Sequence, residues 1–313
     1  MEKIPGFTLT EEGDIIAGEA SKKYACEYAY DDDDEDNNCE QLIKNIINDE
    51  ELPNLNEIII GLWGDAMDSE EIQIIIDGIV ESQNKGEGKF SHIKSIFFGD
   101  MTYEDCEVSW IIQGDYSKLW AAMPNLEKFG VRGSQELELY DIKHEKLREF
   151  DIICGGLGSD VIESVKDAKL PALERLTLYI GIEDYGFDGD INDIKKLLDK
   201  SDFPNLKHLG LEDSEIQDEI TEAVFNSKYI SQIESLSLAN GTLTDKGGQI
   251  ILDKLKSYPN IKELNLHYNY LSEDMCEKLE ELAEECGVKI DVDDSQEADE
   301  YNGELWYSAM LTE

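Results

Sequence analysis

Apolar residues in this chain of 313 residues recur in the pattern L-x-x-L-x-L, with Leu, Ile, Val or Phe at the three apolar positions. Eight copies begin at residues 55, 93, 126, 147, 173, 206, 233 and 261. Four copies are introduced by nearly identical four-residue motifs, which are LPNL (52–55), MPNL (123–126), LPAL (170–173) and FPNL (203–206). Chance does not produce such a series, so an internal repeat organises the chain.

Between the copies, the apolar spacing changes to that of an amphipathic helix. Ile72, Ile75, Ile76, Ile79 and Val80 follow the i, i+3, i+4, i+7, i+8 spacing of one buried helix face. The same spacing returns after the copies at 206 and 261. The copies at 126 and 147 begin only 21 residues apart, which predicts a strand and a loop without a full helix. A strand followed by a helix in most repeats predicts parallel strands.

The spacing of the copies is that of leucine-rich repeats, whose period is about 20–29 residues. We therefore predict an α/β fold, a curved leucine-rich-repeat solenoid with a parallel β-sheet on its concave face and helices on its convex face. Residues 1–54 are predicted to form an N-terminal cap region with the acidic loop DDDDED (31–36), and residues 55–287 the solenoid. Residues 288–313 are predicted to hold a closing strand in VKIDV (288–292) and an acidic tail. Such caps cover the apolar ends of a repeat array.

Charge narrows the classes of partner. The formal net charge is -45, from 72 acidic and 27 basic residues. Such a surface repels nucleic acid and anionic membranes, so we expect a protein partner, either basic or presenting a carboxylate. The N-terminal residues lack the pattern of a signal peptide, and no apolar run is long enough for a membrane span, which predicts a cytoplasmic protein.

Several words between the repeats resemble a family of uncharacterised bacterial cytosolic leucine-rich-repeat proteins. They are FFGDMTYEDCEVSWIIQGD (97–115), GIEDYGFDGD (181–190), LGLEDSEIQDEI (209–220) and LANGTLTDKG (238–247). The repeat style is also similar to the ribonuclease-inhibitor branch, which binds proteins on its concave face. The resemblance implies a protein-binding scaffold and assigns no activity.

Strand alternation predicts that positions +2, +4 and +6 of each copy, counted from its first apolar residue as zero, face the concave solvent side. The chain has only three arginines, and two of them, Arg132 and Arg175, fall in these columns together with Lys128. These side chains either recognise a carboxylate or another anion, or are neutralised by Glu149 and Asp151 on the next strand. Further binding candidates in the same columns are Tyr179, His208 and His267.

Two longer loops are predicted to leave the strands at one edge, where functional residues commonly lie. Residues 99–115 contain Trp110 and Asp115, and residues 179–190 contain Asp184 and Tyr185. Aromatic side chains in such loops suit a protein-binding hot spot. For Trp110 itself we favour the other interpretation and predict that it packs into the repeat stack together with Ile111 and Ile112.

No set of residues in the sequence predicts catalysis, a metal site or a cofactor. Asp188-x-Asp190-x-Asn192 echoes a calcium loop, but Asp193 stands where the turn requires glycine. We therefore predict a non-enzymatic protein–protein interaction module that binds on the concave face or the adjacent loop edge. The alternative is an enzyme or enzyme subunit that holds an anionic substrate with the basic trio and transfers protons through Asp115 or Asp184.

Overall fold

The computed structural model describes residues 15, 18–27, 38–86 and 88–311. The chain forms two compact units, of which the first comprises residues 1–153, 168–173 and 313, and the second residues 154–167 and 174–312. The boundary falls inside the predicted repeat array. The predicted acidic loop, 31–36, lies outside the described residues.

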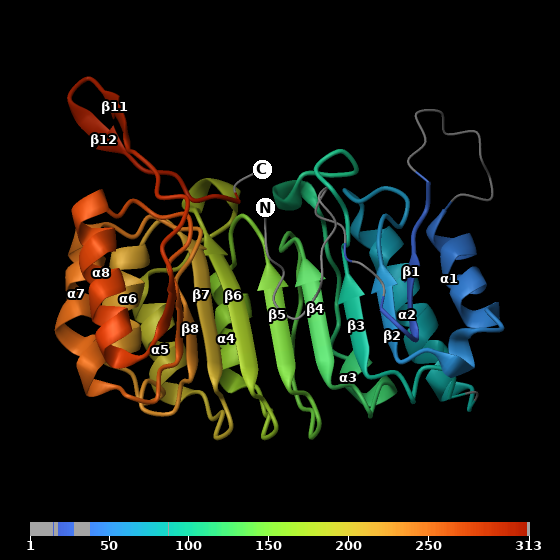
Figure 1. Ribbon diagram of the computed structural model, residues 1–313. Coiled ribbons are helices and arrows are strands. Elements are labelled where there is room, and N and C mark those ends of the chain that lie inside the picture. The colour runs from blue at the N-terminus through green and yellow to red at the C-terminus, as the bar shows by residue number, and fades with distance from the viewer. Residues whose placement is uncertain (1–14, 16–17, 28–37, 87, 312–313) are drawn as a thin grey trace. The chain divides into compact units, whose positions relative to one another are not determined.

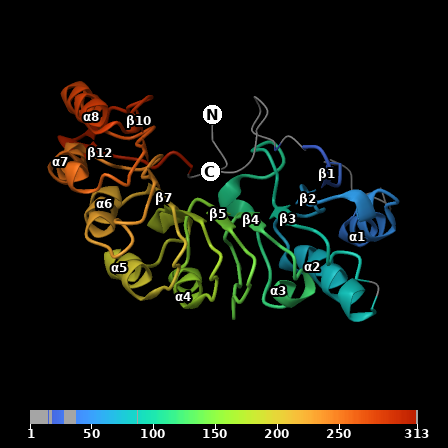
Figure 2. The same cartoon turned by 60° about the horizontal axis from the view of Figure 1, so that its bottom comes forward.

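Among the described residues of the first unit, five strands lie side by side in chain order, and neighbouring strands pair in parallel (Figure 1). These strands are β1 (Ser21–Tyr24), β2 (Glu57–Ile60), β3 (Ser95–Phe98), β4 (Lys128–Arg132) and β5 (Glu149–Ile153). Its helices are α1 (Cys39–Asn48), α2 (Ser69–Asn84) and the short α3 (Leu119–Ala122), with 3-10 turns at Leu52–Asn54 and Val108–Trp110. In this unit the helices lie on one face of the strands (Figure 2).

The second unit repeats the arrangement with parallel strands in chain order and helices beside them. The strands are β6 (Arg175–Gly181), β7 (His208–Ser214), β8 (Ser235–Ser237), β9 (Glu263–Asn265) and β10 (Lys289–Asp291). The helices are α4 (Ser159–Asp167), α5 (Ile191–Lys200), α6 (Gln217–Phe225), α7 (Asp245–Lys254) and α8 (Glu273–Cys286), with 3-10 turns at Glu183–Tyr185 and Leu255–Ser257. A separate antiparallel hairpin, β11 (Asp299–Tyr301) and β12 (Glu304–Trp306), projects from this unit (Figure 1).

Strand register follows the sequence repeat. Where two strands of one unit belong to successive copies, the +2 residue of one lies opposite the +2 residue of the next, as in Lys128 opposite Glu149 and Arg175 opposite His208. The predicted closing strand is confirmed as β10, which pairs in parallel with β9. The structure describes every residue between β4 and β5, and no helix lies among them. The short interval between these two copies predicted this.

The core of each unit is built from the predicted apolar positions. The buried face of α2 is confirmed, with Ile72, Ile75 and Ile79 fully buried. In the first unit the core is also aromatic, and the ring of Phe129 lies 5.0 Å from that of Trp120 and 5.5 Å from that of Phe150. Within the described residues, each helix is too short or too polar to cross a bilayer.

The strand face opposite the helices, called the inner face below, is far less open to solvent than predicted. The +4 side chains of five copies are at most 3% exposed, namely Ile59, Phe97, Asp151, Thr177 and Ser237. In the first unit a Cβ atom at Gly130 would come within 2.4 Å of the Phe97 ring, so this ring lies close against the backbone of the next strand. Exposure on this face is therefore greatest at the +2 positions, where Lys128 and Glu149 are half-buried.

An acidic pocket at the ends of the last strands

The basic side chains of β4 are engaged in contacts within the first unit. Lys128 Nζ lies 3.0 Å from the carboxylate of Glu149, so the predicted neutralisation across strands occurs at this residue. Arg132 is only 5% exposed, and its guanidinium donates to the carbonyl of Met101 in the loop after β3. Gln113 donates to the carbonyl of Arg132 at 2.7 Å. Arg132 therefore anchors a loop, because its charged group points into the protein and not to solvent.

Arg175 belongs to the second unit and lies half-buried on β6, opposite His208 of β7. His208 Nδ1 lies 3.0 Å from the hydroxyl of Ser235. Burial, together with the positive charge of Arg175, lowers the pKa of His208 to about 3. His208 is therefore neutral near pH 7.

Substitution of His208 by glutamine is expected to weaken the pH dependence of stability on the acid side. The folded-state pKa of about 3 lies below the ordinary value of about 6.5, so between these values the unfolded chain binds a proton that the folded chain does not. The free energy of unfolding of the wild type should thus fall as pH is lowered through this window, and the His208→Gln variant should lose less. Urea unfolding at pH 7, 5.5 and 4.5 measures the difference. An equal fall in the free energy of unfolding of the two proteins between pH 7 and pH 4.5 would contradict the lowered pKa of His208.

The loop after β3 presents Trp110 to solvent, with 57% of the residue exposed, whereas Ile111 is fully buried. The prediction that Trp110 packs into the stack is therefore wrong, because only the neighbouring isoleucine side chain turns inward. The same loop exposes Tyr103 to 76%. Ile112 N donates to Ala66 O at 2.8 Å, and this bond joins the loop to the one after β2, where Met67 is 56% exposed.

The other loop candidates differ in accessibility. Asp115 is half-buried and its carboxylate accepts from the backbone N–H of Ser117 at 2.8 Å. Tyr179 is fully buried, and its hydroxyl accepts from Asn240 Nδ2 at 3.1 Å. Asp184 is exposed and Tyr185 half-buried, both within a 3-10 turn. The two carboxylates, Asp115 and Asp184, belong to different units.

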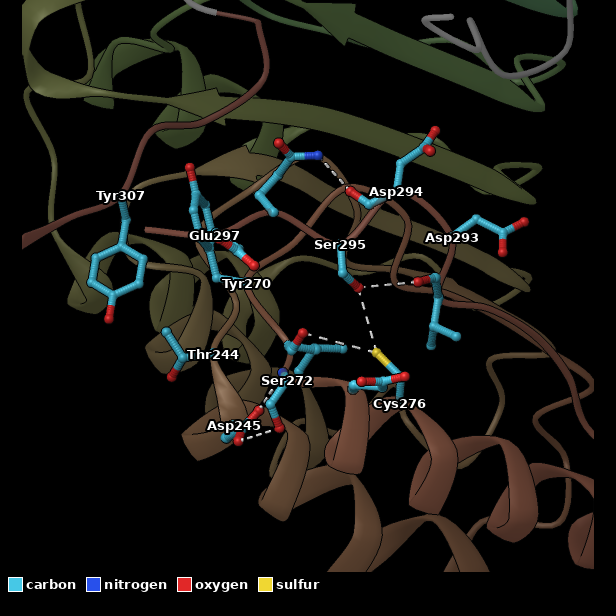
Figure 3. A pocket seen from close by; sticks show the side chains of 14 residues that line it. Thr244, Asp245, Tyr270, Ser272, Cys276, Asp293, Asp294, Ser295, Glu297 and Tyr307 are labelled. Carbon is cyan, nitrogen blue, oxygen red and sulfur yellow. Dashed lines mark hydrogen bonds between the residues drawn. The ribbon is translucent and has the colours of Figure 1, made fainter. Parts of the chain in front are cut away.

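A cavity of about 830 Å³ opens in the second unit, among the loops that follow β8, β9 and β10 (Figure 3). We call it the acidic pocket, because five carboxylates line it, those of Asp245, Glu273, Asp293, Asp294 and Glu297. No Lys or Arg is among its described lining residues. His267 lies beside it, with Nε2 at 3.5 Å from Asp294 Oδ2 and Nδ1 at 3.5 Å from Asp291 Oδ1.

One wall of the acidic pocket is formed by hydrogen bonds that repeat along the chain. The Asp245 carboxylate accepts from both the backbone N–H and the hydroxyl of Ser272, at 2.8 Å each. One repeat earlier, the Asp218 carboxylate accepts from the N–H and hydroxyl of Thr244, at 2.9 and 2.8 Å. Ser272 is also the N-cap of α8 and accepts from Met275 N at 3.2 Å. The start of α6 thus binds the start of α7, and the start of α7 binds the start of α8.

Two tyrosines complete the acidic pocket. The rings of Tyr270 and Tyr307 meet edge to face, with their centroids 5.0 Å apart. The Tyr270 hydroxyl donates to Ser308 O at 3.0 Å and accepts from Ser308 N at 2.9 Å, which fixes the ring. Carboxylates beside aromatic rings suit an ammonium or guanidinium group, which gains both ion pairing and cation–π attraction. Among the residues the structure describes, no group of three His, Cys, Asp or Glu side chains is placed to hold a metal ion.

The pocket was missed at the sequence level, because its acids are scattered among many others. A local signal does exist, since Thr244-Asp245 and Ser272-Glu273 begin helices at equivalent positions of successive repeats. The wall from residues 292–297 and Tyr307 follows the last strand and has no repeat pattern to reveal it.

The chain was compared with family models, curated proteins and solved structures. No family model matches it, and neither does any curated protein. A crystal structure of a protein from Bacteroides fragilis, determined as a structural-genomics target, is 39% identical, with a TM-score of 0.81. The match covers 93% of this chain and 77% of the Bacteroides protein. The chain therefore belongs to the same protein family as this Bacteroides fragilis protein.

Proposed function

We propose that this chain is a non-enzymatic protein-interaction module of the leucine-rich-repeat type, which binds a basic segment of a partner protein in the acidic pocket. The single observation that carries the proposal is the lining of this pocket, where five carboxylates stand with no described Lys or Arg. The pocket lies at the ends of parallel strands, on loops held by a repeated scaffold, where recognition residues commonly occur.

The chemistry of recognition follows from the lining. A lysine or arginine side chain of the partner would form ion pairs with Asp293, Asp294 or Glu297, which are all exposed. The cation would lie against the ring of Tyr307. The ring of Tyr270 packs against the Tyr307 ring and holds that ring in place. The formal net charge of -45 favours encounter with a basic partner over longer distances.

Two further observations bear on the class of function. The exposed Met67, Tyr103 and Trp110 in the first unit are residue types that protein interfaces favour. The enzymatic alternative has less support, because Arg132 is buried against Met101 and Lys128 is paired with Glu149. These contacts leave little of the predicted anion-binding trio for a substrate.

The proposal is tested by titrating the protein with a fluorescently labelled heptalysine peptide and following its anisotropy. The double variant Asp293→Asn/Glu297→Gln should bind about tenfold more weakly, since each lost exposed ion pair contributes up to about 1 kcal/mol. The control variant Glu280→Gln/Glu284→Gln removes the same charge from exposed positions of α8 that do not line the pocket, and should bind nearly as the wild type does. Equal losses in both variants would show a diffuse charge effect and reject the pocket as the site.

A further inference from the structure

The last described residues of the chain lie against the carboxyl ends of β7 and β8 in the second unit. After the β11–β12 hairpin, residues 307–311 run back toward β8 and β7 (Figure 1). Met310 N donates to Asn240 O at 2.8 Å, just beyond β8. Leu311 N donates to the carboxylate of Asp213, in β7, at 2.8 Å. Ala309 is only 3% exposed, so the segment packs against the protein at this residue.

The hydrogen bonds of this segment are made through its backbone. Ser308, Met310 and Leu311 each use the main-chain N–H, and Ser308 also uses its carbonyl. The side chains of Met310 and Leu311 remain partly exposed. The surface beneath therefore recognises an extended main chain with a small residue at the position of Ala309, which other sequences satisfy as well.

The two residues that accept hydrogen bonds from the segment are buried. Asp213 and Asn240 are 0% and 6% exposed, and both adopt left-handed backbone conformations, with φ of 58° and 66°. Asp and Asn adopt such conformations more readily than other residues apart from glycine. Asn240 Nδ2 is fixed by Tyr179 Oη at 3.1 Å and by Glu212 Oε2 at 3.2 Å. Asn240, whose carbonyl accepts from Met310, is thus held in place by groups outside the segment.

We propose that this surface, called the peptide seat, is an interaction site that the chain's own Ser308–Leu311 segment fills, and that an extended segment of a partner protein replaces it. The partner segment has a small residue followed by two residues with free backbone N–H groups. The inference rests on the proposed function only in that the partner is a protein. Replacement also changes the acidic pocket, because Tyr307 adjoins the segment and lines that pocket.

The test uses a chain ending at Tyr307 and the synthetic peptide SAMLTE, which corresponds to residues 308–313. The peptide should bind the shortened chain and bind the full chain at least about tenfold more weakly, because the tethered segment competes at an effective concentration near millimolar. N-methylation of the peptide nitrogens that correspond to Met310 and Leu311 should abolish binding. Equal binding to both chains, or none to a folded shortened chain, would overturn the proposal.

A substitution in the seat provides a matched control. Asp213→Gly removes the acceptor of Leu311 N and suits the left-handed backbone, so it should weaken peptide binding to the shortened chain about tenfold, as expected for a hydrogen bond to a charged group. Asn302→Gly makes the same kind of change at a φ of 53° in the β11–β12 turn and should leave binding unchanged. SAMLTE carries no basic residue, so its result is independent of the heptalysine titration.

Hydrogen exchange on the intact chain tests the proposal even if the shortened chain does not fold. The amides of Met310 and Leu311 should exchange by local opening, faster than the amide of Leu211 in β7. Exchange of all three at the rate of global unfolding would mean that the segment is not replaceable. A dimer of the full chain that is lost on shortening would identify a second copy as the occupant and would also overturn the proposal.

Discussion

Replacement of Gly181 by alanine is expected to destabilise the second unit by about 4–5 kcal/mol. A Cβ atom at this position would lie 1.9 Å from Gly155 O and 2.4 Å from Gly156 Cα, both rigid backbone atoms. The residue also has a φ of 72°, which costs an alanine about 1–2 kcal/mol. Displacing the packed backbone adds about 3 kcal/mol. The midpoint of urea unfolding, followed by far-ultraviolet circular dichroism, measures the loss.

Gly287→Ala separates the two contributions to this effect. Gly287 follows α8 with a nearly identical φ of 69°, yet nothing lies within 4 Å of the Cβ that an alanine would add. This variant should lose only about 1–2 kcal/mol, the cost of the left-handed conformation. Similar losses in the two variants would mean that the close approach of Gly155 and Gly156 to β6 is not rigid.

Replacement of Asn269 by alanine is expected to cost about 3–4 kcal/mol. The Asn269 side chain, 1% exposed, donates to Leu238 O at 2.9 Å and to Leu266 O at 3.0 Å. Its Oδ1 accepts from Leu243 N at 3.0 Å. Alanine would leave these three backbone groups buried without the partner, at about 1–3 kcal/mol for each group that no water reaches. Urea unfolding again provides the measurement.

Asn265→Ala is the matched control, because the same residue type stands in the same repeat. Its half-buried side chain donates to the hydroxyl of Ser237 and accepts from His267 N, both at 3.1 Å. Because water can reach these groups, the loss should stay near about 1 kcal/mol. Comparable costs for the two variants would refute the structural role assigned to Asn269. The backbone carbonyl of Asn269 also accepts from Gln296 N, at 2.7 Å. Asn269→Ala keeps this carbonyl but removes the side-chain bonds that position it, so the substitution should loosen the wall of the acidic pocket.

The acidic pocket and the peptide seat share one segment of chain. Residues 292–297 and Tyr307 line the pocket, and Ser308–Leu311 fill the seat. A partner with a basic residue near an extended segment could engage both. Its occupation of the seat would displace Tyr307 from the pocket, so the two bindings are expected to be coupled.

Much of the local structure could be predicted from the sequence. The register of the strands, the buried face of α2, the missing helix between β4 and β5 and the closing strand β10 all follow from the spacing of apolar residues. Alternation of two and periodicity of 3.6 are local properties of a chain, and the repeats supply each strand with a neighbour of the same pattern. The sequence by itself therefore determined the elements, their direction and their order within each unit.

The candidate sites required the tertiary structure. Alternation identifies the side chains on the inner face but not what covers them, so Arg132 was expected in solvent and is buried against Met101. The peptide seat joins Asp213 to Leu311, which are 98 residues apart in the chain. The acidic pocket gathers Asp245 from the start of α7, Asp294 from the loop after β10 and Tyr307 from the segment after β12. No local spacing encodes these distances, because they arise only when the repeats stack and the last segment folds back across them.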